Sequence, residues 1–281
     1  MKNILLPTDF SENAWNAIFT ALKLYSNIAC KFYLLNAYEP NTLNLLGRKS
    51  QERLGIIYDS LAQHSQLELE KVLGYLEEHH QNTGHSFETI SVAETLEEAV
   101  EETVTSKDID LIVMGTQGAT GAKEVFMGSN TVKLLKSVKS VPILVVPSGH
   151  DFKSLKTFAF STDFNKSYSK FELKTMLELA KHWQTKIQIL HVAVEFALNE
   201  QQKVNQEQLK ERLKEVGMVI KNIEFEANVA HSLQNYLSEN RVDLMALIRY
   251  QHSFWEKIIR EAVVKKLSFH AKVPLLILPE S

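Results

Sequence analysis

Short apolar runs alternate along this chain with longer stretches whose apolar residues recur at helical spacing. In the first half, the runs predict strands at about residues 3–6, 32–37, 86–92, 110–114 and 143–146. Runs that are apolar on both faces, such as Leu111–Met114, are typical of parallel sheets covered by helices on both sides. The pattern therefore predicts an α/β fold with a doubly wound, five-stranded parallel sheet.

The second half of the chain repeats the first. Four segments recur in the same order: NILLPTDF and TFAFSTDF, KFYLLNA and KIQILHV, IDLIVMG and VDLMALI, and VPILVVPS and VPLLILPE. The distance along the chain between matching segments far exceeds the roughly 20–50 residues of a solenoid unit. The repeat therefore predicts two tandem domains, 1–148 and 154–281. The helix after the first strand of the second domain is expected to bury an apolar face made of Phe171, Met176, Leu177 and Ala180.

Composition and charge exclude several classes of protein. The 281 residues include 44% hydrophobic residues, and no apolar run approaches the length of a membrane span. Pro7 and Asp9 interrupt the N-terminal apolar run, so we expect a cytoplasmic protein without a signal peptide or a membrane partner. One cysteine excludes a disulfide framework. The net charge is −3 and no Lys/Arg block stands out, which argues against a nucleic-acid partner.

Glycine is scarce but clustered. Of ten glycines, four lie between residues 115 and 128, and one, Gly217, lies beyond residue 149. The segment GTQGATGAKEVFMGSNT leaves an apolar strand and enters a helix predicted to begin near Ser129. Glycine lets backbone N–H groups turn toward a ligand, and a helix N-terminus favours phosphate. A tight turn that binds nothing is the competing interpretation.

Two common phosphate-binding motifs do not fit this loop. Ala122 separates Gly121 from Lys123, so the Gly-Lys-Ser/Thr of a Walker A loop is missing. The Rossmann pattern would follow the first strand, where this chain has Pro7-Thr8-Asp9.

The residues instead resemble the universal stress protein family. Gly115-x2-Gly118-x9-Gly128-Ser129 matches the G-x2-G-x9-G-(S/T) motif of its ATP-binding members, and the PTDFS, IVMG and VPILVVP segments are also similar. The resemblance implies an adenine nucleotide alpha hydrolase-like fold in each copy, with ATP, accompanied by Mg²⁺ or not, across the ends of the first and fourth strands. It also implies that copies pair through their last strands, here as an internal pseudo-dimer; a homodimer of chains stays open.

The resemblance assigns a role to each site residue. Pro7, Thr8 and Asp9 would border the adenine and ribose, with Ala37 on the adenine side. Met114 and Gly115 would lie beside the ribose and phosphate path. The phosphates would be held by Gly118, Gly128, Ser129, Asn130 and Thr131. Asn36 departs from the His of many members.

The second copy keeps Thr162 and Asp163 but lacks the phosphate loop. Ile248 and Gln251 align with Gly115 and Gly118, and Arg260 and Glu261 align with Gly128 and Ser129. We expect a domain that has kept the fold and lost the site, with Arg249 and Arg260 on a solvated surface.

No catalytic or metal site is predicted elsewhere. Asp9 and Asp163 are expected to cap the helices that follow them, in addition to any ligand contact. Cys30 is expected to be a packing residue, and the spacing of the histidines does not suit zinc. The stretch Leu43–Leu76 is either one long helix or a helix with a mobile lead-in, and it offers a partner surface, a lid or ordinary core packing.

Three functions stay open. The first is an ATP-binding stress-response regulator with one nucleotide site and an unidentified protein partner. The second is slow ATP hydrolysis or phosphoryl transfer at the same loop, against which no base and no paired carboxylates for Mg²⁺ can be assigned. The third is a scaffold whose second domain binds another small ligand or a protein.

Overall fold

A computed structural model describes residues 1–39, 48–116, 127–193, 197–249 and 273–280 of the chain. The strands are β1 (Lys2–Pro7), β2 (Cys30–Ala37), β3 (His85–Val92), β4 (Leu111–Gly115), β5 (Ile143–Val146), β6 (Phe158–Ser161), β7 (Ile187–Ala193), β8 (Met218–Glu224), β9 (Leu244–Ile248) and β10 (Leu275–Leu278). The helices are α1 (Glu12–Leu24), α2 (Arg48–His79), α3 (Leu96–Ser106), α4 (Ser129–Ser137), α5 (Lys174–His182), α6 (Glu200–Arg212) and α7 (Val229–Glu239).

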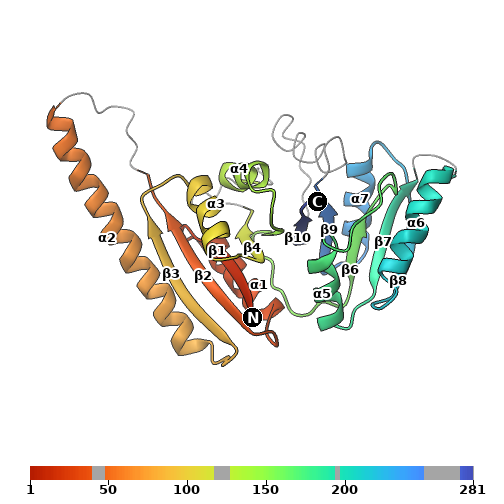
Figure 1. Ribbon diagram of the computed structural model, residues 1–281, viewed down its shortest axis with the longest axis horizontal. Coiled ribbons are helices and arrows are strands. Elements are labelled where there is room, and N and C mark those ends of the chain that lie inside the picture. The colour runs from red at the N-terminus through yellow and green to blue at the C-terminus, as the bar shows by residue number, and fades with distance from the viewer. Residues whose placement is uncertain (40–47, 117–126, 194–196, 250–272, 281) are drawn as a thin grey trace.

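The ten strands found among the described residues form one sheet in the order β3-β2-β1-β4-β5-β10-β9-β6-β7-β8 (Figure 1). Neighbouring strands run parallel except at the centre, where β5 and β10 are antiparallel and Leu144 lies opposite Leu276. Each half therefore has the order predicted for a doubly wound domain, and the two halves mirror each other about the β5–β10 pair. The α/β fold and the pairing of the two last strands are confirmed.

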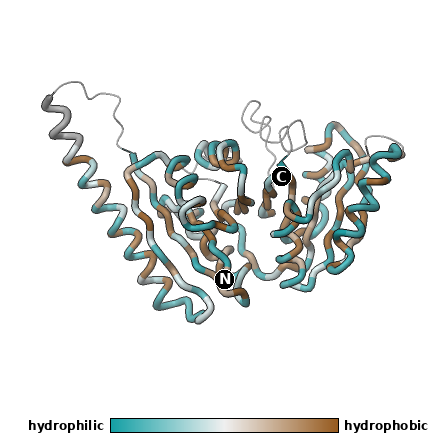
Figure 2. The backbone as a smooth tube through the Cα atoms, viewed as in Figure 1, coloured by the Kyte–Doolittle hydropathy of each residue, from teal (hydrophilic) through white to brown (hydrophobic). Residues whose placement is uncertain are grey.

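Helices cover both faces of the sheet. Along β1, Ile4 and Leu6 face one apolar cluster and Leu5 faces the other, as the alternation of side chains along a strand requires. Residues of α1, α2, α5 and α6 contribute to the first cluster, and residues of α3, α4 and α7 to the second. Both clusters continue across the β5–β10 pair. Figure 2 shows the hydrophobic residues concentrated on the strands inside these helical layers.

The two halves repeat the hydrogen bonds that join their first and fourth strands. In the first half, the Asn3 N–H donates to the Asp110 carboxylate (3.0 Å), and the Asp110 N–H donates back to the Asn3 carbonyl (2.8 Å). Thr157 and Asp243 make the same two bonds in the second half, at 2.8 and 3.0 Å. An aspartate of the repeated IDL and VDL segments thus fixes the same strand pair twice.

The turn after the first strand of each half also has one conformation. Phe10 and Phe164 both adopt a positive φ, of 63° and 59°, which is uncommon for a bulky residue. Their N–H groups donate to the hydroxyls of Thr8 (3.0 Å) and Thr162 (2.9 Å). The Thr-Asp-Phe sequence therefore encodes a specific turn, which holds Asp9 at the carboxyl edge of the sheet.

Two expectations about helices need correction. Phe171 does not belong to the buried face of the helix after β6: the helix α5 begins three residues later, at Lys174, and Phe171 is 61% exposed. Asp163 does not cap that helix either, because its carboxylate accepts the N–H of Asn165 at 3.0 Å, within the turn. In the first half the same turn leads directly into α1 at Glu12, whereas in the second half residues 165–173 separate it from α5.

The chain between β2 and β3 includes one long helix, α2, of 32 residues. Leu69, Val72 and Leu76 of this helix are buried against the sheet. Residues 55–60, nearer its start, are exposed, and in Figure 1 this end of α2 rises beyond the strands. The long-helix interpretation is therefore correct for residues 48–79, and residues 40–47 lie outside the described residues. None of the helices described is both long and apolar enough to cross a membrane.

Cys30 is fully buried at the start of β2, and burial raises the pKa of its thiol to about 12. A thiol with so high a pKa is protonated at neutral pH and is a poor nucleophile. The packing role expected for Cys30 is confirmed.

Two histidines join the end of α2 to the start of β3, and we expect them to make stability depend on pH. His80 Nε2 lies 2.7 Å from His85 Nδ1, and burial, followed by the charge of His85, lowers the pKa of His80 below its usual 6.5. At a pH between the two pKa values, His80 is therefore protonated in the unfolded chain and neutral in the folded chain. The free energy of unfolding should therefore keep the full contribution of neutral His80 above about pH 6.5. It should lose that contribution as the pH decreases through the folded pKa of His80.

Denaturant unfolding of the wild type and of His80→Gln, at about pH 7.5 and about pH 5.5, measures this effect. The substitution should reduce the loss of stability on acidification, whereas His79→Gln, at an exposed neighbour, should leave it unchanged. Equal losses in the wild type and in His80→Gln would show that the histidine pair does not cause the effect.

Candidate functional site

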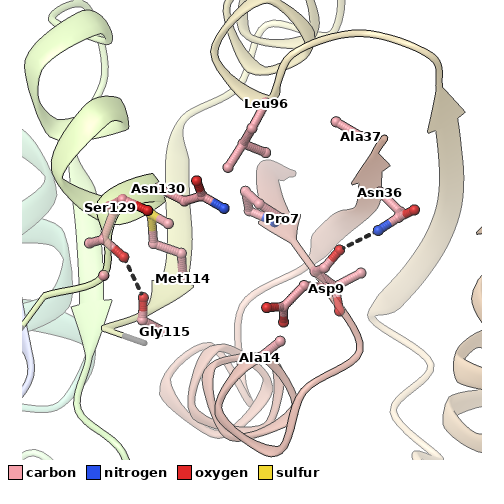
Figure 3. A pocket seen from close by; sticks show the side chains of 13 residues that line it. Pro7, Asp9, Ala14, Asn36, Ala37, Leu96, Met114, Gly115, Ser129 and Asn130 are labelled. Carbon is pink, nitrogen blue, oxygen red and sulfur yellow. Dashed lines mark hydrogen bonds between the residues drawn. The ribbon is translucent and has the colours of Figure 1, made fainter. Parts of the chain in front are cut away.

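A cavity of about 310 Å³ opens at the carboxyl ends of β1, β2 and β4 (Figure 3). Ten of the eleven residues predicted from the sequence line it; the other, Gly118, lies outside the described residues. The lining residues are Pro7, Thr8, Asp9, Ala14, Asn36, Ala37, Leu96, Met114, Gly115, Gly128, Ser129, Asn130 and Thr131. The carboxyl edge beside the first and fourth strands is where α/β sheets bind ligands.

The turn after β1 forms one wall. The Ser11 hydroxyl donates to the Asp9 carboxylate (2.6 Å) and accepts the N–H of Ala14 (3.2 Å). Ser11, and not Asp9, is therefore the N-cap of α1. The capping role expected for Asp9 is wrong in this respect: Asp9 instead orients the capping serine, and it does so while lining the cavity.

The end of β2 forms the adjoining wall through a residue that was not included among the predicted site residues. Asn36 is buried, and its side-chain N–H donates to the Thr8 carbonyl at 2.7 Å (Figure 3). His191 occupies the matching position of the second half, where Nδ1 donates to the Thr162 carbonyl at 3.1 Å. The sequence feature that could have identified Asn36 as a site residue is its position as a polar residue near the end of a buried strand. Its function is to hold the β1 turn, which either Asn or His can do.

Gly115 ends β4 where the strand meets α1 at very short range. A Cβ at this position would lie 2.3 Å from Nδ2 and 3.0 Å from the backbone oxygen of Asn13. No side chain fits there without displacing the helix. The first glycine of the motif therefore has a packing role in addition to any ligand contact.

Hydrogen bonds also hold the start of α4 beside the end of β4. The Thr131 hydroxyl donates to the Gly115 carbonyl at 3.0 Å, and the Gly128 N–H donates to the Thr116 carbonyl at 2.6 Å. The second bond joins two described residues that lie before and after the segment 117–126. Because the Thr131 hydroxyl already has an acceptor, its contribution to an anion site would come from its backbone N–H.

The start of α4 has the features of an anion-binding helix end. The helix begins at Ser129 as predicted, and its N-cap, Gly128, offers no side-chain acceptor to the first-turn N–H groups. That first turn contains no acidic residue, and Ser129 and Asn130 are exposed at the cavity (Figure 3). Unpaired N–H groups and the positive end of the helix dipole favour a negatively charged ligand here.

Apolar, amide and hydroxyl groups make up most of the cavity lining that the structure describes. Asp9 is the one ionisable side chain among the thirteen residues that the structure places around the cavity. General acid–base or metal-assisted hydrolysis uses a positioned base, or a set of carboxylates around a metal. The described lining supplies apolar, amide and hydroxyl groups around one helix N-terminus, which suits recognition of a phosphate-bearing molecule.

In the second half, side chains of α6 hydrogen-bond the turn that follows β6. The Gln202 side chain of α6 donates to the Asp163 carbonyl (2.9 Å), and that of Asn205 donates to the Phe164 carbonyl (2.8 Å). The buried Tyr168 hydroxyl hydrogen-bonds Thr162. In the first half, α2 contacts the matching turn, where the His64 ring lies against Phe10 with ring centroids 6.3 Å apart. Gln251, Arg260 and Glu261 lie outside the described residues.

Comparison with known proteins identifies the family. Residues 1–147, more than half of the chain, match the universal stress protein family. The chain belongs to that family. Two universal stress proteins of Methanocaldococcus jannaschii, MJ0531 and MJ0577, are each 28% identical to it, over 145 and 157 residues. Each alignment covers 52% of this chain, with 81% of MJ0531 and 94% of MJ0577.

Solved structures extend the likeness of this universal stress protein to the whole chain, at the level of fold. A universal stress protein from Archaeoglobus fulgidus aligns over 99% of this chain and 96% of its own length, with a TM-score of 0.70 and 15% identity. A functionally unknown protein of Pseudomonas aeruginosa, PA1789, aligns over 99% and 92%, with a TM-score of 0.63 and 12% identity. The likeness in fold therefore extends over both halves of the chain.

Proposed function

We propose that this universal stress protein binds one ATP, in the cavity of its first half, and acts as a nucleotide-responsive regulator rather than as a metabolic enzyme. The observation that carries the proposal is the start of α4, where Gly128 leaves the first-turn N–H groups without a side-chain cap at the cavity. The same residues complete the glycine motif of the ATP-binding members of the family.

Each part of a nucleotide has matching groups around the cavity. Pro7, Thr8 and Ala37 would border the adenine, with Asp9 near the ribose. Met114 and Gly115 would lie along the path from ribose to phosphates. The phosphates would contact Gly118, Gly128, Ser129, Asn130 and Thr131. A cavity of about 310 Å³ is at the lower end of the range for small-molecule sites, roughly 300–1,000 Å³.

The residues that line the cavity would hold Mg²⁺ only together with the phosphates of a bound nucleotide. Magnesium is usually held through one or two carboxylates together with substrate phosphate oxygens. The described lining offers the single carboxylate of Asp9, which already accepts the Ser11 hydroxyl. The ion would therefore arrive with the nucleotide.

We further propose that residues 154–281 are a degenerate copy of residues 1–148. The repeated Asp–Asn and Asp–Thr hydrogen bonds and the two positive-φ phenylalanines support a duplication. Ile248, which ends β9 where Gly115 ends β4, supports loss of the site. The second half would then serve as the internal partner of the first through β10, and its outer surface is available to an unidentified protein.

Photolabelling with an azido-adenine analogue of ATP, followed by peptide mapping, tests the proposal. Label should appear in peptides that contain Pro7 or Ala37, and an excess of ATP should suppress it. Label within residues 154–281, or label that ATP does not suppress, would contradict the assignment of the site to the first half. Label in both halves, suppressed by ATP in each, would contradict the degenerate second copy.

A further inference from the structure

The helix α4 connects the cavity to the second half of the molecule. Its first turn, at Ser129 and Asn130, lines the cavity. Its other end, the C-cap Val138, is buried in an apolar cluster that also contains Val242 and Leu275 of the second half. Nine residues of helix span about 14 Å, so one short rigid element lies between the two regions.

The second half holds the far end of α4 through one charged side chain. Arg249 directly follows β9, and its backbone N–H donates to the Leu278 carbonyl at 3.1 Å. From this fixed position its guanidinium donates to the carbonyl of Val138, 111 residues earlier in the chain. The expectation that Arg249 lies on a solvated surface is therefore wrong.

The charge of Arg249 is placed where it stabilises the helix. A helix C-terminus carries partial negative charge and unpaired carbonyls, so a cation that donates to one of them is favourable. Burial lowers the pKa of Arg249 to about 10, which leaves the guanidinium protonated at neutral pH. A partly buried charge is screened less by solvent than an exposed one.

Other contacts hold α4 near its start and along its length. Thr131 is bonded to the Gly115 carbonyl, and Lys133 forms an ion pair with Glu97 of α3 at 3.1 Å. These contacts come from the first half. Among the residues that the structure describes, the Arg249 bond is the one polar contact by which the second half reaches α4. Replacing Arg249 removes this contact with α4 and changes no residue of the cavity lining.

We propose that Arg249 is a positioning residue for the nucleotide site, which makes the affinity for ATP depend on the second half of the chain. The inference rests on the proposed function. A phosphate at the start of α4 and the guanidinium at its end contact the same helix. Each therefore stabilises the position of α4 in which the helix also contacts the other. By linkage, a nucleotide that orders α4 also strengthens its contact with the second half.

The test compares Arg249→Met and Arg249→Lys with Arg241→Met, a change at an exposed arginine that precedes the same strand. Calorimetry measures the Kd for ATP, and hydrogen exchange measures the protection of the α4 amides without nucleotide. Arg249→Met should weaken ATP binding about tenfold and speed exchange in the last turn of α4. Arg249→Lys, which keeps the cation, should retain most of the affinity, and Arg241→Met should resemble the wild type.

The outcomes separate this inference from the proposed function. If Arg249→Met speeds exchange in α4 but binds ATP as tightly as the wild type, the contact is purely structural and the positioning role is wrong. An equal loss of affinity in the Met and Lys variants would also overturn it, because the helix-end cation would not be the cause. If the wild type itself binds no ATP, the proposed function fails, and the coupling to a nucleotide fails with it.

Discussion

Gly115→Ala should destabilise the folded protein by about 2–3 kcal/mol, in the range measured for overpacked cores. The added Cβ would lie 2.3 Å from Nδ2 and 2.7 Å from Cγ of Asn13, well inside contact distance. Moving the Asn13 side chain relieves those two contacts but leaves the Cβ 3.0 Å from the Asn13 backbone oxygen. Helix α1 must therefore shift away from β4, and denaturant unfolding measures the cost.

A double-mutant cycle with Asn13→Ala identifies the cause. Removing the Asn13 side chain should recover part of the loss, so that the double variant is more stable than the sum of the single changes predicts. Gly74→Ala is the control, because a Cβ at this exposed position of α2 meets nothing within 4 Å and should stabilise the helix by up to about 1 kcal/mol. Additive effects at Gly115 and Asn13 would show that the close approach is not what excludes a side chain.

Asn130→Asp should weaken ATP binding about 50-fold while leaving the nucleotide-free protein as stable as the wild type or slightly more stable. The change is nearly isosteric and adds one negative charge to the first turn of α4, which has none. An acid there interacts favourably with the helix dipole, by about 0.3–1 kcal/mol. Toward a phosphate about 7 Å away, at an effective dielectric constant of about 20, the same charge is repulsive by about 2.4 kcal/mol.

The opposite signs of these two effects distinguish a ligand site from a structural one. Thermal unfolding without nucleotide and calorimetric titration with ATP measure them separately. Asn228→Asp makes the same change at the start of α7 in the second half, where the residue caps its helix, and it should leave ATP binding unaltered. An Asn130→Asp protein that binds ATP as tightly as the wild type would place the phosphates elsewhere.

Much of the fold follows from local sequence pattern. The apolar runs predict the five strands of the first half within two residues at either end. Strands β1, β2, β4 and β5 are largely buried and contain few polar residues, as expected of a sheet covered on both faces. The start of α4 at Ser129 also agrees, since a glycine N-cap after a loop marks a helix start. The extent of α2 was left open by the pattern, because the stretch before it is leucine-rich and polar by turns.

The contacts that were missed involve residues far apart in the chain. Ala14 and Leu96 line the cavity from two different helices, and nothing in their local sequence distinguishes them from ordinary core residues. Arg249 was expected at a solvated surface because its acceptor, the Val138 carbonyl, lies in the other half of the chain. Phe171 was assigned to a buried helix face by its spacing, whereas the helix begins after it.

The central claim is that one ATP binds in the first half, at the start of α4. Calorimetric titration of the wild-type chain with ATP and Mg²⁺ tests it most directly, with Asn130→Asp titrated in parallel. We expect saturation at one nucleotide per chain in the wild type and a much weaker isotherm in the variant. Two equivalent sites per chain, or no heat of binding in the wild type, would contradict the account.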